Sequence, residues 1–167
     1  MTAVNNPPEW THPRIANPDA LRSHWPEIAH EANQALWRRK DAYPARVTAG
    51  KMSAEDAAQE IATWQEIAND WDWICTGLGT PASKDSLPER INALDTAIER
   101  FFQVVDGQGG TMTPEMALQG AALATMRWFA ERERAHDYTK QVRWLAGFGH
   151  DWRARNLKNA TEERKAA

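Results

Sequence analysis

The stretch that decides the fold reads SAEDAAQEIATWQEIANDWDWIC at residues 53–75. Its apolar residues recur at spacings of 4, 3, 4, 3 and 4, at Ala57, Ile61, Trp64, Ala68, Trp71 and Cys75. These spacings place the side chains on one face of an α-helix. Ser53 is a typical N-cap residue, and Asp56 follows it three residues later in a variant of the capping box. The stretch therefore predicts a long amphipathic helix that ends at Gly77.

A second stretch, SLPERINALDTAIERFFQVV at residues 86–105, repeats this pattern. Its apolar residues have the same spacings, at Leu87, Ile91, Leu94, Ile98, Phe101 and Val105. Ser86 and Glu89 form a capping box, with Pro88 inside the first turn. Two helices with matching stripes are expected to pack at a shallow angle. We therefore expect one shared core that contains Ile61, Trp64, Trp71, Ile91, Leu94 and Ile98.

Weaker patterns predict the remaining helices. Residues 26–40 carry an apolar face and end in Arg38-Arg39-Lys40, which suits a helix C-terminus, and Pro44 should then break or kink the chain. A long fourth helix begins at residue 114, with the face Ala117, Ala121, Ala124 and Trp128. Its polar continuation, residues 131–137, is expected to be exposed on most sides. Glycines at 147 and 149 should stop the helix, and residues 150–159 should form a last short one.

Together these patterns predict an all-α bundle of about five to six helices with an extended, Pro-rich N-terminal arm. The arm is assigned to residues 1–17, a single helical domain to 18–160 and a solvated tail to 161–167. Two arrangements of the arm remain open: it is disordered, or Trp10 pins it to the body.

Length and composition agree with one globular domain. The chain has 167 residues, of which 26% are charged and 42% hydrophobic, and a net charge of −3. These values exclude a collagen, a disulfide-rich mini-protein and a wholly disordered chain. The sequence has no run of 18 apolar residues, no signal-peptide pattern at its start and one cysteine. We therefore expect no membrane segment, no intramolecular disulfide and a location in the cytoplasm.

No motif points to catalysis. Glu27 and His30, and again Glu133 and His136, have the Glu-x-x-His spacing of di-iron helical bundles. Both pairs, however, point away from the apolar faces of their predicted helices, so solvated surfaces are expected. Cys75 lies on a core stripe near a helix C-terminus, where the dipole does not favour a thiolate. We expect no catalytic residue, no metal and no cofactor, and hence a protein that is not an enzyme.

Charge is divided unevenly along the chain. Residues 1–126 carry 10 basic and 17 acidic residues, whereas residues 127–167 carry 10 basic and 6 acidic ones. Aromatic residues are interleaved with the basic ones in the second part, and tryptophan and arginine are frequent among binding hot spots. The candidate binding surface therefore consists of Trp144, Trp152, Arg143, Arg153, Arg155, Lys158 and Trp10.

A partial resemblance covers residues 38–62. The basic pair Arg38-Arg39, Tyr43-Pro44, Val47, Gly50-Lys51 and Ser53 precede an alanine-rich helix. This order resembles a helical hairpin found in small uncharacterised phage and prophage proteins. The resemblance implies an origin in a phage or another mobile element, and hence a location in the cytoplasm of a bacterial host, and it implies no activity.

These observations favour a phage- or prophage-encoded, non-enzymatic accessory factor that binds another protein, such as a modulator or inhibitor of a host or defence protein. One alternative is an accessory protein that binds nucleic acid through the basic, aromatic-rich segment 127–158. Another is a structural component of the virion. The sequence indicates neither the identity of the partner nor the oligomeric state.

Overall fold

The computed structural model describes residues 9–136 and 139–166. These residues form five α-helices: α1 (Trp25–Thr48), α2 (Ala54–Thr76), α3 (Leu87–Gly107), α4 (Pro114–His136) and α5 (Thr139–Ala166). A short 3₁₀ helix, η1 (Lys84–Ser86), precedes α3. No strand occurs in these residues; one isolated bridge joins His12 and Ile15. The predicted all-α class is confirmed.

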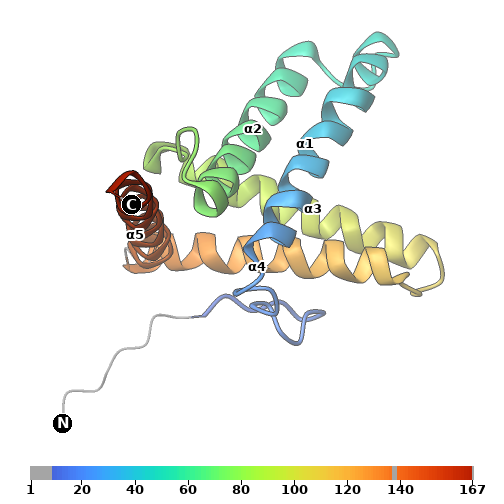
Figure 1. The fold of residues 1–167 in the computed structure, drawn as a ribbon. Helices are drawn as coiled ribbons and strands as arrows, with labels where there is room; N and C mark the ends of the chain where they lie inside the picture. The colour runs from blue at the N-terminus through green and yellow to red at the C-terminus, as the bar shows by residue number, and fades with distance from the viewer. Residues whose placement is uncertain (1–8, 137–138, 167) are drawn as a thin grey trace.

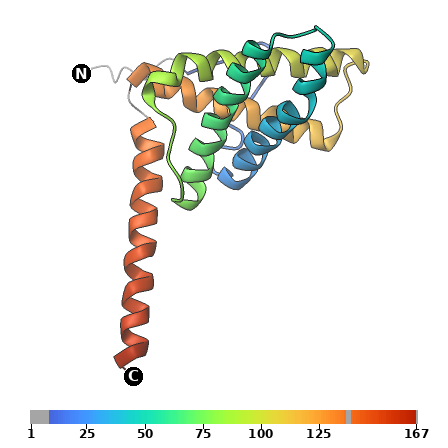
Figure 2. The ribbon, with the colours of Figure 1, turned by 90° about the horizontal axis from the view of Figure 1, so that it is seen from above.

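The helices form two antiparallel hairpins that lie across each other (Figure 1). α1 packs along α2, and α3 packs along α4. The expected shallow packing of α2 along α3 is therefore wrong: α2 crosses α3, as Figure 2 also shows. The connections explain the difference. Only residues 49–53 join α1 to α2, which makes them antiparallel neighbours, whereas the longer segment 77–86 lets α3 turn away from α2.

The predicted core is confirmed. Ile61 is half-buried and packs against the core cluster, which contains the five other predicted residues in buried positions: Trp64, Trp71, Ile91, Leu94 and Ile98. Ser53 caps α2 as expected, since its side chain accepts a hydrogen bond from the Asp56 N–H at 3.0 Å. Gly77 ends α2 in the left-handed conformation, at φ 73°.

Helix α4 departs most from expectation. Residues 122–131 are buried on every side, because α1, α3 and α5 all contact this helix. The expectation that residues 131–137 are exposed on most sides is wrong at Glu131 and Glu133, each 8% exposed. Glu133 therefore does not lie on a solvated face, while Glu27 and His30 do; the side chain of His136 lies outside the described residues.

The buried charges of α4 are paired both within this helix and with neighbouring helices. The Arg127 guanidinium donates from Nε to Asp95 of α3 at 2.7 Å and from Nη1 to Glu131 at 2.8 Å. Nη1 of the buried Arg90, in α3, lies 3.6 Å from Glu133 and 3.9 Å from Asp70 of α2. Burial of these charges is tolerated because each ion has a counter-ion close by.

Three expected helix ends are absent. α1 continues through Pro44 to Thr48, so the Arg38-Arg39-Lys40 run lies in mid-helix and not at a C-terminus. The side chain of Tyr43 is 4% exposed, and this packing holds the helix together where proline removes one backbone N–H. α5 runs without interruption through the glycines at 147 and 149 and through residue 161 to Ala166.

The described part of the N-terminal arm folds back onto α3 and α4. Trp10 is half-buried, with the Arg127 guanidinium 5.3 Å from its ring centroid. Arg14 makes two hydrogen bonds to Asp106, of 2.8 and 2.9 Å, and lies over the Phe102 ring. Of the two arrangements left open by the sequence, residues 9–17 adopt the one in which Trp10 pins the arm.

The burial of Trp64 yields the first prediction. Trp64→Ala should lower the free energy of unfolding by about 3–5 kcal/mol, because it removes a fully buried side chain and leaves a cavity. Trp37→Ala is the matched control. That side chain is 60% exposed, so its loss should change stability by less than about 0.5 kcal/mol. Urea unfolding followed by circular dichroism compares the two, and equal midpoints would remove Trp64 from the core.

Arg90 yields the second prediction. Arg90→Met should cost about 3–5 kcal/mol, because the change leaves two buried carboxylates without this cation. Arg22→Met is the control, since the Arg22 side chain is 65% exposed and pairs with Asp19, three residues earlier on the surface. The same unfolding measurement applies. If Arg90→Met unfolded at the same urea concentration as the wild type, the ion pairs of Arg90 would contribute nothing to the free energy of unfolding.

Candidate functional site

Three of the seven predicted binding residues have side chains that the structure describes. Trp10 packs against the core beneath Arg127, so it belongs to the body of the protein. Arg155 and Lys158 are exposed on α5. The side chains of the other four lie outside the described residues, at Trp144, Trp152, Arg143 and Arg153.

Helix α5 is attached to the body through its first half. Ala146 is buried, and His150 Nε2 donates a hydrogen bond to the Trp73 carbonyl oxygen at 2.9 Å. The His150 ring meets the Trp73 ring edge-on, with centroids 5.8 Å apart. A Cβ at Gly77 would lie 2.8 Å from this imidazole, so glycine at the end of α2 leaves room for it.

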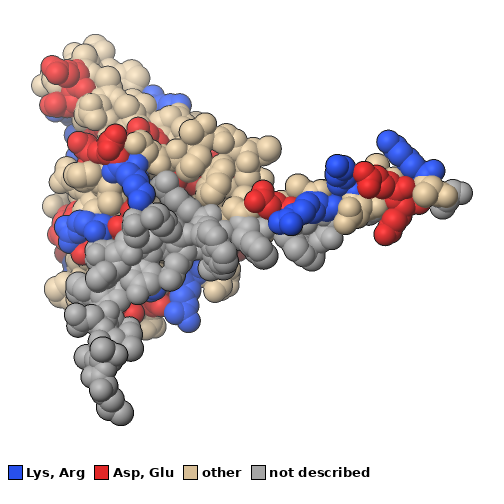
Figure 3. Space-filling view, turned by 90° about the vertical axis from the view of Figure 1, so that its left-hand side faces the viewer, with Lys and Arg blue, Asp and Glu red and all other residues tan. Residues whose placement is uncertain are grey.

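The second half of α5, residues 151–166, projects away from the body (Figure 2). Every described side chain in this half is exposed. Figure 3 shows both acidic and basic residues along the projection. A single helical face carries charges of both signs at spacings of 4, 3, 4 and 3, at Asp151, Arg155, Lys158, Glu162 and Lys165.

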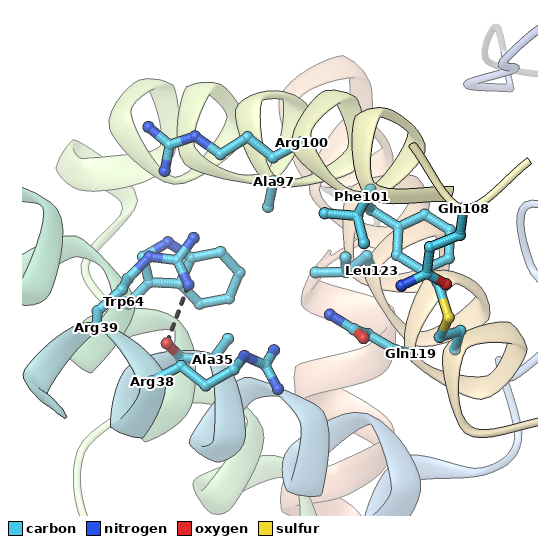
Figure 4. Close-up of a pocket in the computed structure, with 12 residues that line it drawn as sticks. Ala35, Arg38, Arg39, Trp64, Ala97, Arg100, Phe101, Gln108, Gln119 and Leu123 are labelled. Carbon is cyan, nitrogen blue, oxygen red and sulfur yellow. Dashed lines mark hydrogen bonds between the residues drawn. The ribbon is translucent and has the colours of Figure 1, made fainter. Parts of the chain in front are cut away.

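A cavity of about 310 Å³ lies where the two hairpins cross (Figure 4). Arg38 and Arg39 of α1 line it together with Arg100 of α3. Figure 4 shows Arg39 lying against Trp64 on one side of the cavity, opposite Phe101 and Leu123. The remaining lining includes two amide side chains, Gln108 and Gln119.

Two carboxylates hold the three arginines in place. Glu60 of α2 accepts hydrogen bonds of 3.1 Å from Arg39 Nε and from Arg100 Nη1. Glu31 pairs with Arg38. Three guanidinium groups and two carboxylates leave one positive charge in this group of side chains.

The same network shifts the pKa values of both carboxyl groups, in opposite directions. Burial raises the pKa of Glu31 above its ordinary value, and the pairing with Arg38 offsets only part of this effect. Burial also acts to raise the pKa of Glu60, but hydrogen bonds from Tyr43 and Arg39 and the charges of Arg39 and Arg100 outweigh it. The pKa of Glu60 is therefore lowered, and this carboxylate is the stable counter-ion of the cavity.

The apolar walls of the cavity are close-packed. The Arg39 guanidinium lies 4.3 Å from the Trp64 ring centroid, a cation–π contact. An added Cβ at Gly120 of α4 would lie 2.7 Å from the Phe101 ring, so this ring rests directly on the α4 backbone. Trp64 is fully buried, and its indole Nε1 has no hydrogen-bond partner in the described part of the chain.

Sequence reasoning missed this cavity, although one signal was present. Arg39 follows Ile28, Ala32 and Ala35 at spacings of 4, 3 and 4, so an arginine occupies a position on the apolar stripe of α1. The interpretation of Arg38-Arg39-Lys40 as a helix C-terminus concealed this signal. A basic residue on a core stripe indicates either a buried ion pair or a polar cavity.

Two further features bear on chemistry. The pKa of the Cys75 thiol is raised by burial and by the charges of Asp72 and Glu27, which disfavours the reactive thiolate. Among the residues that the structure describes, no three His, Cys, Asp or Glu side chains are grouped so as to hold a metal ion. The described helices include none with a segment apolar and long enough to cross a membrane.

Comparison with protein families, curated proteins and solved structures found no match to this chain. The projecting helix and the arginine-lined cavity are the two features of the described residues that bear on function.

The lowered pKa of Glu60 yields a pH prediction. A carboxyl group whose pKa is lower in the folded than in the unfolded state stabilises the protein above the unfolded value, and this stability is lost as the pH falls through the folded pKa. Glu60→Gln should therefore reduce stability at pH 7 by about 1.5–3 kcal/mol, the contribution of a hydrogen bond to a charged group.

The difference in the free energy of unfolding between the wild type and Glu60→Gln should become smaller at acidic pH, once Glu60 is protonated in both the folded and the unfolded protein. Urea unfolding from pH 7 down to about pH 3 measures it, within the range where carboxyl groups titrate. Asp41→Asn, on an exposed part of α1, is the control and should show little difference at any pH. A Glu60→Gln difference that does not change with pH would contradict the assignment of the charge to Glu60.

Proposed function

We propose that the chain is a non-enzymatic accessory protein of phage or prophage origin that binds another protein through residues 151–166 of α5. The observation that carries this proposal is the projection of this half-helix, all of whose described side chains are exposed. It spans about 24 Å at 1.5 Å per residue. The helix is thus presented to a partner on more than one side.

Energetics support a partner at this helix. Most of the stability of a helix in a protein comes from packing one face against other parts, and short isolated helices are marginal in water. The described side chains of residues 151–166 have no such packing, whereas Ala146 and His150 fix the first half to the body. A protein surface that covers the second half would supply the missing contacts.

The charges favour a protein over a nucleic acid as the partner. Asp151, Glu162 and Glu163 are interspersed with the basic residues, and carboxylates repel a phosphate backbone. A partner surface with charges of both signs in complementary positions would pair with the acidic and the basic residues of α5. Such pairing favours one alignment of the partner along the helix and disfavours other proteins. We therefore infer a partner whose binding face carries both acidic and basic residues, in positions complementary to these charges.

Charge reversal on α5 tests this proposal. The variant Arg155→Glu with Lys158→Glu should bind the partner at least about tenfold more weakly, equivalent to about 1.4 kcal/mol. The partner is first captured by crosslinking wild-type protein in bacterial lysate, then purified and titrated by calorimetry. Hydrogen exchange of the complex should show new protection at the amides of residues 151–166.

The control has the same change in charge on the body, Arg22→Glu with Lys51→Glu, and both of these side chains are exposed. It should bind the purified partner like the wild type. Equal affinity of the α5 variant, or protection confined to the body, would refute the proposal. A gel shift with nucleic acid at ~100 mM salt that the α5 variant loses would favour the nucleic-acid alternative.

A further inference from the structure

We propose that the cavity between the hairpins is a binding site for an organic anion, a molecule with a carboxylate or phosphate group on an apolar body. This site shares no residue with the projecting half of α5, so the inference stands independently of the proposed function. A volume of about 310 Å³ falls within the range of small-molecule sites, about 300–1,000 Å³.

The charged group of the ligand is identified by the arginines. Arg38, Arg39 and Arg100 come from two different helices and line one cavity. Each guanidinium has five N–H donors and remains charged, and its planar fork matches the oxygens of carboxylate and phosphate. Glu31 and Glu60 neutralise only two of the three charges. An anion in the cavity would compensate the third.

The position of these arginines allows a ligand to reach them. The Arg38 and Arg100 side chains are 43% and 46% exposed, while that of Arg39 is 12% exposed and is held by Glu60 and by the Ala35 carbonyl oxygen. Two arginines therefore stand at the opening, and a third lies fixed further inside. This arrangement attracts an anion at the surface and binds it where the dielectric constant is lower.

The apolar body of the ligand is identified by the opposite wall. Phe101 and Leu123 lie opposite Arg39 and Trp64, and Ala97 and Met116 also line the cavity. Aromatic and aliphatic walls with a few charged groups are typical of sites for small amphipathic molecules.

Calorimetric titration of the full chain tests the inference with phenyl phosphate and 4-phenylbutyrate as anionic probes. Inorganic phosphate tests the need for an apolar body, and benzyl alcohol tests the need for a charge. At least one aromatic anion should bind, and both reference compounds should bind at least about tenfold more weakly. The indole N–H resonance of Trp64 should shift on addition of the bound probe, whereas that of Trp37, which is exposed, should not.

Two variants should act in opposite directions, which a merely structural effect would not produce. Arg100→Gln should weaken binding of the aromatic anion about tenfold or more, because a charge-assisted hydrogen bond is lost. Glu60→Gln removes the carboxylate that competes for Arg39 and Arg100, so it should strengthen binding. Arg22→Gln, which lies outside the cavity, should leave binding unchanged, and circular dichroism should show that all three variants fold.

The inference is overturned if neither aromatic anion binds, if benzyl alcohol or inorganic phosphate binds equally well, or if Arg100→Gln and Arg22→Gln have the same affinity. Loss of protein binding by the α5 variant would leave these titrations unchanged, so failure of one proposal is distinguishable from failure of the other.

Discussion

The buried guanidinium of Arg90 brings together three helices and the loop before α3. It lies between Asp70 of α2 and Glu133 of α4, and it donates to the Ser86 hydroxyl at 3.1 Å and to the Ser83 carbonyl oxygen at 3.0 Å. A charge this deeply buried is tolerated only with its counter-ions in place. One hairpin therefore cannot slide along the other without separating these groups. The positions of the remaining elements depend on this constraint.

The crossing also explains why a cavity exists. Helices that lie along one another close the space between them, whereas hairpins that cross leave room beside the crossing point. Arg39 occupies a stripe position of α1 at this place, and it covers the Trp64 ring with a guanidinium where a core would otherwise have an aliphatic side chain. The charge must then be compensated nearby, which Glu60 does for Arg39 and Arg100 together. The crossing of the hairpins thus leaves the cavity, and the arginine that occupies it requires the carboxylate of Glu60.

Sequence patterns predicted the helices that have one apolar face, and failed where that assumption does not hold. The stripes of α2 and α3 are regular because each helix is half-exposed. Glu131 was predicted to be exposed because its sequence neighbours are charged. Residues 122–131 of α4 are buried all round, however, and Glu131 pairs there with Arg127, whose other counter-ion is Asp95 of α3. Spacing along one chain contains no information on which distant carboxylate pairs with Arg127. The cavity was missed for the same reason, since Arg38, Arg39 and Arg100 meet only through tertiary structure.

Helix α2 connects the two surfaces to which we assign binding. It contributes Trp64 to the cavity and, nine residues later, Trp73 to the attachment of α5. Both contacts depend on the position of α2 against α1 and α3, which the Arg90 ion pairs and the shared core maintain. Coupling between two sites requires an element with two alternative arrangements, and a continuous helix between two packed ends does not supply one. The cavity and the projecting helix are therefore best understood as separate sites on one scaffold, each with its own partner chemistry.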